Sequence, residues 1–196
     1  MPPARLTAAD SALLVIDVQE KLLAFIPPAD RLLLNLSFLL DAARAIGVPA
    51  LVTEQYPKGL GPTHPMIAER LPPNPPAKQA FSCCGVPEVT AGLAGRRTVL
   101  LAGIETHVCV LQTALDLFAQ GLRVVVAADT VASRSAVDHE FALRRMEQAG
   151  AVLTTAEAAA FEWLGTSAAP AFKPVSLLVQ DRMRRLRDLS PPGTTP

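Results

Sequence analysis

Short, continuous apolar runs alternate along the chain with segments whose apolar residues recur at helical spacing. The runs cover residues 12–16, 48–53, 98–102 and 124–128, with a weaker one at 151–154. Each is apolar throughout rather than alternating, which is typical of strands buried on both faces of a sheet. The pattern therefore predicts a set of short, buried strands.

The segments between the runs read as helices. The first ends at Gly47, with Pro49 just beyond, and the second has a possible N-cap in Thr106 and stops before Gly121. The third begins with Ser135 and Asp138, a variant of the capping box. The helices are expected at residues 30–46, 106–120 and 135–148.

Alternating strands and helices imply parallel strands joined by right-handed crossovers, hence an α/β fold with helices on both faces of one open sheet. We expect one such three-layer domain at residues 8–185 and a flexible C-terminal tail at 186–196, whose last residues are Pro, Gly and Thr. The proline-rich stretch 57–76 shows little periodicity and is expected to be mostly loop, and long ordered loops are often functional.

The composition of the chain excludes some classes of binding partner. The chain has 196 residues, half of them hydrophobic, which suits a single packed core. Eighteen basic and eighteen acidic residues give no net charge, so we expect no nucleic-acid partner. No segment has the roughly 20 apolar residues that span a bilayer, and no signal-peptide pattern is seen, so we expect no membrane partner and a cytoplasmic location. Three cysteines, two of them adjacent, read as reduced thiols.

Asp17 directly follows the first apolar run. Ligands of open α/β sheets bind beyond the carboxyl ends of the strands, so a carboxylate at this place is a candidate proton acceptor. Alternatively, Asp17 caps the helix that follows. The residues alone leave both open.

Cys109 follows the third strong run and Thr106, which would put the thiol at the third helical residue, where the helix dipole favours a thiolate and lowers the pKa below about 8.5. The alternative is a small buried hydrophobe, the usual state of a free cysteine. Helical phase favours reactivity, because Cys109 would lie beside Gln112 and Asp116. The expected apolar stripe consists of Val108, Leu111, Leu115 and Phe118.

Lys78 and Gly103 are two further candidates. A partly buried Lys78 would pair with Asp17 and stabilise a thiolate, although most lysines are solvated surface residues. Gly103 ends a strand where backbone N–H groups would face a developing oxyanion, or it is simply a turn glycine.

Other motifs are weaker. His64, His107 and His139 lack partners at zinc-like spacing, so no metal site is expected, and no glycine-rich phosphate signature is present. Cys83 and Cys84 are adjacent, and because adjacent cysteines form only strained disulfides, we read them as small apolar fillers.

Four segments in this order resemble the isochorismatase-like hydrolases. They are Leu13-Leu-Val-Ile-Asp17-Val-Gln19, then Lys78-x-x-Phe81-Ser82, then Gly103-Ile-Glu-Thr106-His-Val-Cys109-Val, and finally Asp129-Thr-Val-Ala-Ser-Arg134-Ser with Ala149-Gly150 downstream. The similarity covers about residues 10 to 165. The stretch from Thr53 to Pro62 is most similar to the branch called isochorismatase domain-containing proteins.

The resemblance implies a Rossmann-like, mostly parallel sheet of five or six strands and a triad. In that triad Cys109 attacks, Asp17 accepts its proton, and Lys78 orients and stabilises charge. It also implies a cis peptide between Ile104 and Glu105, with the N–H groups of Glu105 and Cys109 forming an oxyanion hole. Family members commonly assemble into dimers, tetramers or larger rings, so we expect a homo-oligomer.

Two differences from other family members indicate which type of reaction to expect. Nicotinamidases carry an Asp-x-His metal-binding segment after the second strand, but here the residues are Glu54-Gln55-Tyr56. The isochorismate-cleaving members lack the cysteine. We therefore expect a hydrolase that needs no cofactor and attacks an amide-type carbon of a small molecule through a thioester.

Two other functions remain as alternatives: a non-catalytic or regulatory binding protein that keeps the fold, and a thiol redox sensor. The expected pocket walls lie near the ends of the same segments and are Gln19, Phe25, Gln55, Tyr56 and Phe81.

Overall fold

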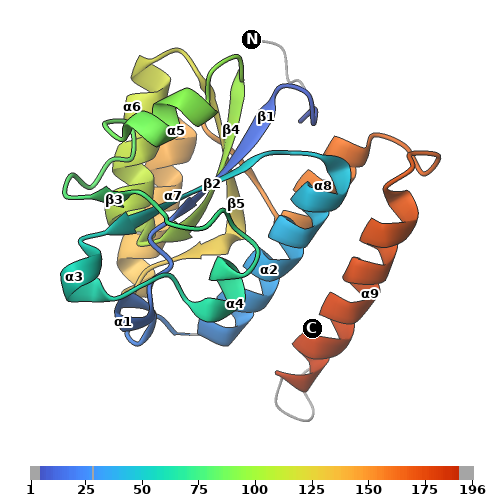
Figure 1. Cartoon of the computed structure of the whole chain (residues 1–196), viewed down its shortest axis with the longest axis horizontal. Coiled ribbons are helices and arrows are strands. Elements are labelled where there is room, and N and C mark those ends of the chain that lie inside the picture. The colour runs from blue at the N-terminus through green and yellow to red at the C-terminus, as the bar shows by residue number, and fades with distance from the viewer. Residues whose placement is uncertain (1–4, 28, 190–196) are drawn as a thin grey trace.

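The computed structural model describes residues 5–27 and 29–189. Its centre is one six-stranded sheet in which every pair of neighbouring strands is parallel (Figure 1). The strands are β1 (Ser11–Ile16), β2 (Ala50–Gln55), β3 (Ala77–Lys78), β4 (Thr98–Ile104), β5 (Arg123–Ala132) and β6 (Val152–Thr154). The predicted α/β class and all five predicted strands are confirmed, and β3 is an edge strand that the hydrophobic pattern did not indicate.

The strand order is β3-β2-β1-β4-β5-β6. The chain builds outward from β1 to β3 on one side and then returns to the centre, where β4 pairs with the other edge of β1. The ends of β1 and β4 therefore flank the point where the strand order reverses. In doubly wound sheets this point opens the crevice that receives ligands.

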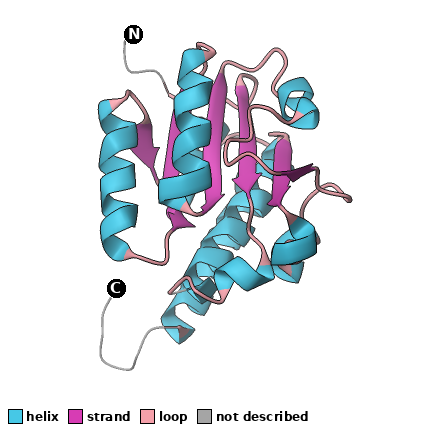
Figure 2. Ribbon diagram, turned by 90° about the vertical axis from the view of Figure 1, so that its left-hand side faces the viewer, coloured by secondary structure: helices cyan, strands magenta, loops and turns pink. Residues whose placement is uncertain are grey.

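Helices cover both faces of the sheet (Figures 1 and 2). One face packs against α2 (Ala29–Ile46) and α8 (Ala156–Leu164), with α9 (Phe172–Asp188) packed against α2. The other packs against α5 (Pro87–Gly92), α6 (Leu111–Ala119) and α7 (Ala136–Gln148). The three layers follow from the uniformly buried strands, which need apolar cover on both sides.

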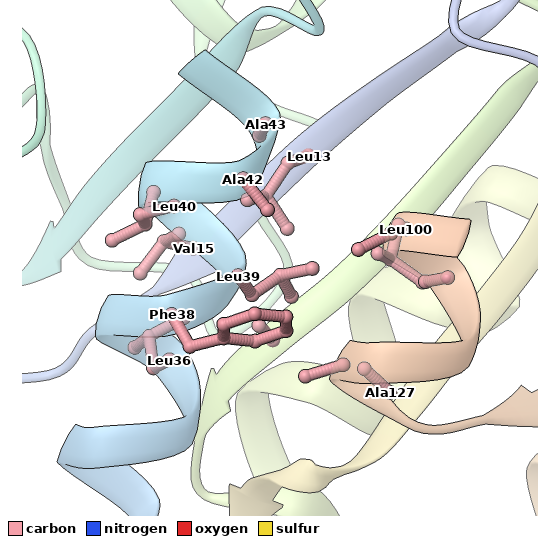
Figure 3. Packing of buried hydrophobic residues seen from close by; sticks show 14 of the residues in the cluster. Leu13, Val15, Leu36, Phe38, Leu39, Leu40, Ala42, Ala43, Leu100 and Ala127 are labelled. Carbon is pink, nitrogen blue, oxygen red and sulfur yellow. The ribbon is translucent and has the colours of Figure 1, made fainter. Parts of the chain in front are cut away.

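Alternate residues of β1 enter the two halves of the core. Leu13 and Val15 point toward α2, where they join Leu39, Leu100 and Ala127 (Figure 3). Ala12, Leu14 and Ile16 belong to the cluster on the opposite face. Burying a leucine side chain contributes roughly 1.5–3 kcal/mol, so these aliphatic layers stabilise the sheet without many aromatic residues.

The loop predicted at 57–76 is ordered by polar contacts with the strand ends. It contains the single-turn helices α3 (Pro57–Leu60) and α4 (Pro65–Ala68), and another single turn, α1 (Glu20–Leu23), follows β1. The Glu54 carboxylate accepts hydrogen bonds from the Thr63 amide at 2.6 Å and the Thr63 hydroxyl at 2.8 Å. The His64 amide donates to the Val18 carbonyl at 2.8 Å, which attaches the loop beside Asp17.

The two C-terminal helices were not among the elements predicted from the sequence. Arg182 anchors α9, because its guanidinium donates to Asn35 at 2.8 Å, Glu157 at 2.8 Å and Asp129 at 3.2 Å. The helix continues to Asp188, past the domain boundary expected at residue 185. The last part of the expected tail, residues 190–196, lies outside the described residues. None of the helices in the described ranges is long and apolar enough to span a membrane.

Candidate active site

Asp17 lies at the carboxyl end of β1 with a left-handed backbone, φ 54°, and its side chain is fully buried. Its Oδ1 accepts a hydrogen bond from the Thr53 hydroxyl at 2.8 Å, and its Oδ2 lies 2.6 Å from the Lys78 ammonium. The next helix, α1, has Gln19 as its N-cap and no side-chain cap. The capping alternative for Asp17 is therefore wrong.

Lys78 is buried, so the alternative of a solvated surface lysine is also wrong. Its ammonium donates to Gln55 Oε1 at 2.7 Å and to the carbonyls of Ala80 and Phe81 at 3.2 and 2.9 Å. Burial alone would lower the pKa of Lys78, but the charge and hydrogen bond of Asp17 outweigh it and raise the pKa. The ammonium thus stays charged beside the carboxylate.

Cys109 lies in a π-helical turn, η1 (Thr106–Val110), that precedes α6. The turn follows a cis peptide bond between Ile104 and Glu105, as the resemblance implied. The Cys109 thiol is buried, and the Asp17 carboxylate is near enough to raise the pKa of the thiol. The structure therefore brings Asp17, Lys78 and Cys109 together.

The helical-phase argument for Cys109 was wrong, because the π turn changes the phase of the helix. Cys109 is buried, as are Val110, Ala114 and Leu117, whereas Leu115 and Phe118 of the expected stripe are only half-buried. A π turn adds a residue to the helical repeat and is frequent at functional sites.

The expected lowering of the Cys109 pKa is also wrong. Burial raises the pKa of the thiol well above its ordinary value, and the negative charge of Asp17 adds to the increase, while Lys78 opposes it. The resting thiol therefore keeps its proton. A carboxylate placed to receive that proton would form the nucleophile as the thiol attacks.

Gly103 lies within β4 next to a change of register with β5. Its φ is 115°, and a Cβ at this position would lie 2.1 Å from the carbonyl oxygen of Ile16. Only glycine permits both the backbone conformation and this approach of the two strands. Gly103 therefore determines how closely the strand that leads to Cys109 lies beside the strand that ends at Asp17.

The Glu105 side chain connects this segment to the loop after β5. Its carboxylate lies 2.8 Å from Arg134 Nη2, accepts from the Arg134 Nε at 3.2 Å and accepts from the Arg134 backbone amide at 2.9 Å. The Glu105 side chain is almost fully buried, whereas the Arg134 guanidinium is largely exposed. These contacts fix the backbone whose amides are the candidates for an oxyanion hole.

The expected pocket walls occupy different environments. Gln19 is fully buried, and its amide donates to the carbonyls of Gln55 and Gly61 at 3.1 and 2.6 Å, so it supports Gln55 rather than facing solvent. Gln55 contacts Lys78 directly. Tyr56 and Phe81 are about half-exposed on the same segments, and Phe25, at 69% exposure, follows α1. Contact between these residues and a substrate stays a prediction.

The remaining candidates have structural contacts. His64 accepts from the Met66 amide and caps α4, His107 contacts Ser133 at 3.0 Å, and His139 contacts Thr106 at 2.9 Å. The three cysteines are free thiols. Across residues 5–27 and 29–189, no three or more His, Cys, Asp or Glu side chains are grouped so that they could hold a metal ion.

Sequence reasoning missed two groups beside the triad: Thr53, which contacts Asp17, and Cys83, which contacts Thr53. The Thr53 hydroxyl lies between Asp17 Oδ1 and Cys83 Sγ, at 2.8 and 3.4 Å. Both side chains are fully buried. The usable signal was their position, because Thr53 lies in β2 beside the end of β1 and Cys83 follows the segment that encloses Lys78.

Comparison with known proteins shows the family of this chain. Residues 11–158 match the model of the isochorismatase domain. "Isochorismatase domain-containing protein 2" of Pongo abelii is 42% identical over 90% of this chain and 86% of its own, and the human protein of the same name is 40% identical over the same shares.

Solved structures give the same result. The structure called MAR1 ribonuclease from Caenorhabditis elegans has a TM-score of 0.86 and 44% identity, covering 98% of each chain. The YcaC product of Escherichia coli, described as an octameric hydrolase of unknown specificity, has a TM-score of 0.87 and 26% identity over 96% of each chain. The chain therefore belongs to the isochorismatase domain family, as the four sequence segments indicated.

Proposed function

We propose that the protein is a metal-independent cysteine hydrolase that cleaves an amide-type C–N bond of a small molecule. The observation that carries the proposal is that one buried carboxylate, Asp17, contacts both the Lys78 ammonium and the Cys109 thiol. A nucleophile, a base and a group that orients the base are the parts that acyl transfer through a covalent intermediate requires.

In the first half-reaction the Cys109 sulfur attacks the carbonyl carbon of the substrate while the thiol proton passes to Asp17. The C=O electron pair moves onto oxygen, where the amides of Glu105 and Cys109 would stabilise the oxyanion. When the tetrahedral intermediate collapses, the C–N bond breaks and Asp17 gives its proton to the leaving nitrogen. The products are an amine or ammonia and a thioester on Cys109.

In the second half-reaction water attacks the thioester carbon and gives one proton to Asp17. Collapse of this intermediate breaks the C–S bond, and the proton returns to the sulfur. A carboxylic acid leaves and the free thiol is restored. Lys78 orients Asp17 in both halves of the cycle, because its ammonium remains charged beside the same carboxylate oxygen.

The contacts of Lys78 favour an uncharged acyl group. Its ammonium already faces four oxygens, those of Asp17, Gln55, Ala80 and Phe81, although it has only three N–H donors. A substrate carboxylate would have to displace one of these partners. We therefore place neutral carboxamides first among the substrates to be tested.

The test is a screen of small amides for release of ammonia or amine, with mass spectrometry of acid-quenched protein. An acyl adduct on the Cys109 peptide, with Cys83 and Cys84 unmodified, supports the mechanism. Turnover that persists in Cys109→Ala would overturn it. The non-catalytic alternative predicts binding without turnover, and a redox sensor predicts rapid oxidation of Cys109, which the protonated thiol does not favour.

The name of the nematode structure adds a second candidate, cleavage of RNA. The balanced charge of this chain does not favour phosphate binding. A labelled RNA incubated with wild-type protein and with Asp17→Asn separates the two candidates, because RNA cleavage that is lost with Asp17 would assign that activity to this site.

The assembly and the cellular location are two further proposals. The octameric state described for the E. coli neighbour supports a homo-oligomer, to be checked by light scattering. We propose a cytoplasmic location from the reduced cysteines, although one relative, 37% identical, is called a secreted effector of Phytophthora sojae. We propose neither a nucleic-acid nor a membrane partner.

A further inference from the structure

Cys83 is a second buried thiol beside the candidate active site. Its side chain is fully buried, and its Sγ lies 3.4 Å from the Thr53 hydroxyl oxygen. That hydroxyl is also 2.8 Å from Asp17 Oδ1. The mechanism above gives Cys83 no chemical step, so its place next to the base needs another explanation.

The direction of the two hydrogen bonds of Thr53 follows from which of the three groups, Asp17, Thr53 and Cys83, carry a proton to donate. An ionised carboxylate only accepts, so the single proton of the Thr53 hydroxyl is donated to Asp17 Oδ1. The Thr53 oxygen then offers only lone pairs to Cys83, and the thiol must donate. Burial, together with the charge of Asp17, raises the pKa of the Cys83 thiol to about 11, so it carries the proton to do this.

The backbone of Cys83 is connected to the nucleophile by a separate route. Its amide donates to the Thr113 hydroxyl oxygen at 3.0 Å, and that hydroxyl donates to the Cys109 carbonyl at 2.7 Å. Thr113 is fully buried in α6, one helical turn after Cys109. Cys83 is therefore linked to Asp17 by its thiol, through Thr53, and to the Cys109 backbone by its amide, through Thr113.

We propose that Cys83 is a positioning residue that orients the Asp17 carboxylate toward the Cys109 thiol, acting through Thr53. The inference rests on the proposed roles of Asp17 and Cys109, and it adds a third group to the control of their geometry. Asp17 Oδ1 is held by Thr53 and Oδ2 by Lys78, so the plane of the carboxylate depends on both contacts. Loss of the thiol donor leaves Thr53 free to rotate and weakens one of them.

The experiment measures alkylation of Cys109 by iodoacetamide, which needs no known substrate. Rates are determined at several pH values by peptide mass spectrometry, which separates Cys109 from the other two cysteines. We expect Cys83→Ala to slow labelling of Cys109 about three- to tenfold near neutral pH, as loss of one hydrogen bond predicts. Cys83→Ser keeps a donor and should restore the rate to within about twofold of wild type.

Cys84→Ala is the matched control, because Cys84 is the adjacent thiol and contacts the Thr113 carbonyl rather than Thr53. It should leave the rate unchanged. Thr53→Ser and Thr53→Val provide a second pair that does not alter Cys83, with the hydroxyl kept in the first and removed in the second. Thermal unfolding of each variant identifies any rate loss that comes from misfolding.

The outcomes separate this inference from the proposed function. If Asp17→Asn changes the labelling rate but Cys83→Ala does not, or if serine restores no more than alanine, the role of Cys83 is wrong. If neither Asp17→Asn nor Cys83→Ala changes the labelling, both the inference and the proposed triad are wrong. If labelling depends on both residues but no amide is hydrolysed, only the proposed reaction is wrong.

Discussion

The Lys78 ammonium lies 2.6 Å from the Asp17 carboxylate, and both side chains are almost completely shielded from solvent. Such a pair is costly to break, because removing one partner leaves the other charge buried and unpaired. The Thr53 hydroxyl donates to the other carboxylate oxygen, and the ammonium donates to Gln55 and to two backbone carbonyls. The pair therefore holds the Asp17 carboxylate in a fixed position near Cys109.

Substituting Asp17→Asn should lower the free energy of unfolding by about 3–5 kcal/mol, because Lys78 keeps its charge without a carboxylate partner. Urea unfolding measures the change. Asp10→Asn is a matched control, since Asp10 lies at the same 2.6 Å from Arg97 but Arg97 is exposed and Asp10 is partly exposed, so little change is expected. Equal losses in the two variants would contradict the buried character of the site.

The buried thiols make stability depend on alkaline pH. Burial raises the pKa of Cys83 from 9.0 to about 11, and burial also raises that of Cys109. Between about pH 9 and 11 the unfolded chain loses protons that the folded protein keeps, so stability is fully present below pH 9 and falls as pH rises.

The expected slope is about 1.4 kcal/mol per pH unit for each thiol. Guanidinium unfolding across this range should show a shallower fall for Cys83→Ala than for wild type. Between pH 6 and 8 the pH dependence of the two proteins should coincide, which serves as the control. An identical slope for both above pH 9 would mean that Cys83 does not stay protonated in the folded state.

Arg134→Ala should slow any amide turnover about tenfold, because the Glu105 carboxylate would lose its two guanidinium contacts and the Glu105 amide would be held less firmly for an oxyanion. The effect on the free energy of unfolding should be small, since the guanidinium is largely exposed. Arg144→Ala is the control, because Arg144 pairs with Glu140 on the surface of α7 at 2.5 Å. A similar loss of rate in both variants would show that Arg134 has no specific role in positioning Glu105.

Gly103→Ala should lower the free energy of unfolding by about 3 kcal/mol or more, since its Cβ would collide with the Ile16 carbonyl. Gly95→Ala separates the collision from the backbone preference, because Gly95 also has a positive φ, 76°, but has open space around it. It should cost about 1 kcal/mol. Thermal or urea unfolding compares them, and equal costs would show that the strands separate easily at Gly103.

The sequence predicted the strands well, because continuous apolar runs leave few alternatives for segments of this length. It missed β3, which has two residues and hence no measurable period, although this strand carries Lys78. It also placed Cys109 on the wrong helical phase, since a π turn has no hydrophobic signature of its own. The hydrophobic pattern thus locates regular strands and helices, but it misses the short strand and the π turn that carry Lys78 and Cys109.

The triad was predicted through the order of its motifs, and it lies together in the structure. Thr53 and Cys83 were missed because a small residue in a buried segment is read as core packing whether or not its polar atom is used. Their roles depend on contacts between segments far apart in the chain. Such contacts leave no periodic trace in the sequence.

The central pairing of β1 with β4 also determines at which stage of folding the Cys109 thiol comes to lie beside Asp17. Asp17, Thr53, Lys78 and Cys83 all precede β4 in the chain, while Cys109 follows it. A partly folded chain in which β4 has not joined β1 would carry an ordinary, solvent-accessible thiol with no carboxylate beside it. Pairing between segments so distant in sequence is slow to form, so the chemistry of Cys109 is expected to appear only with the last stage of sheet assembly.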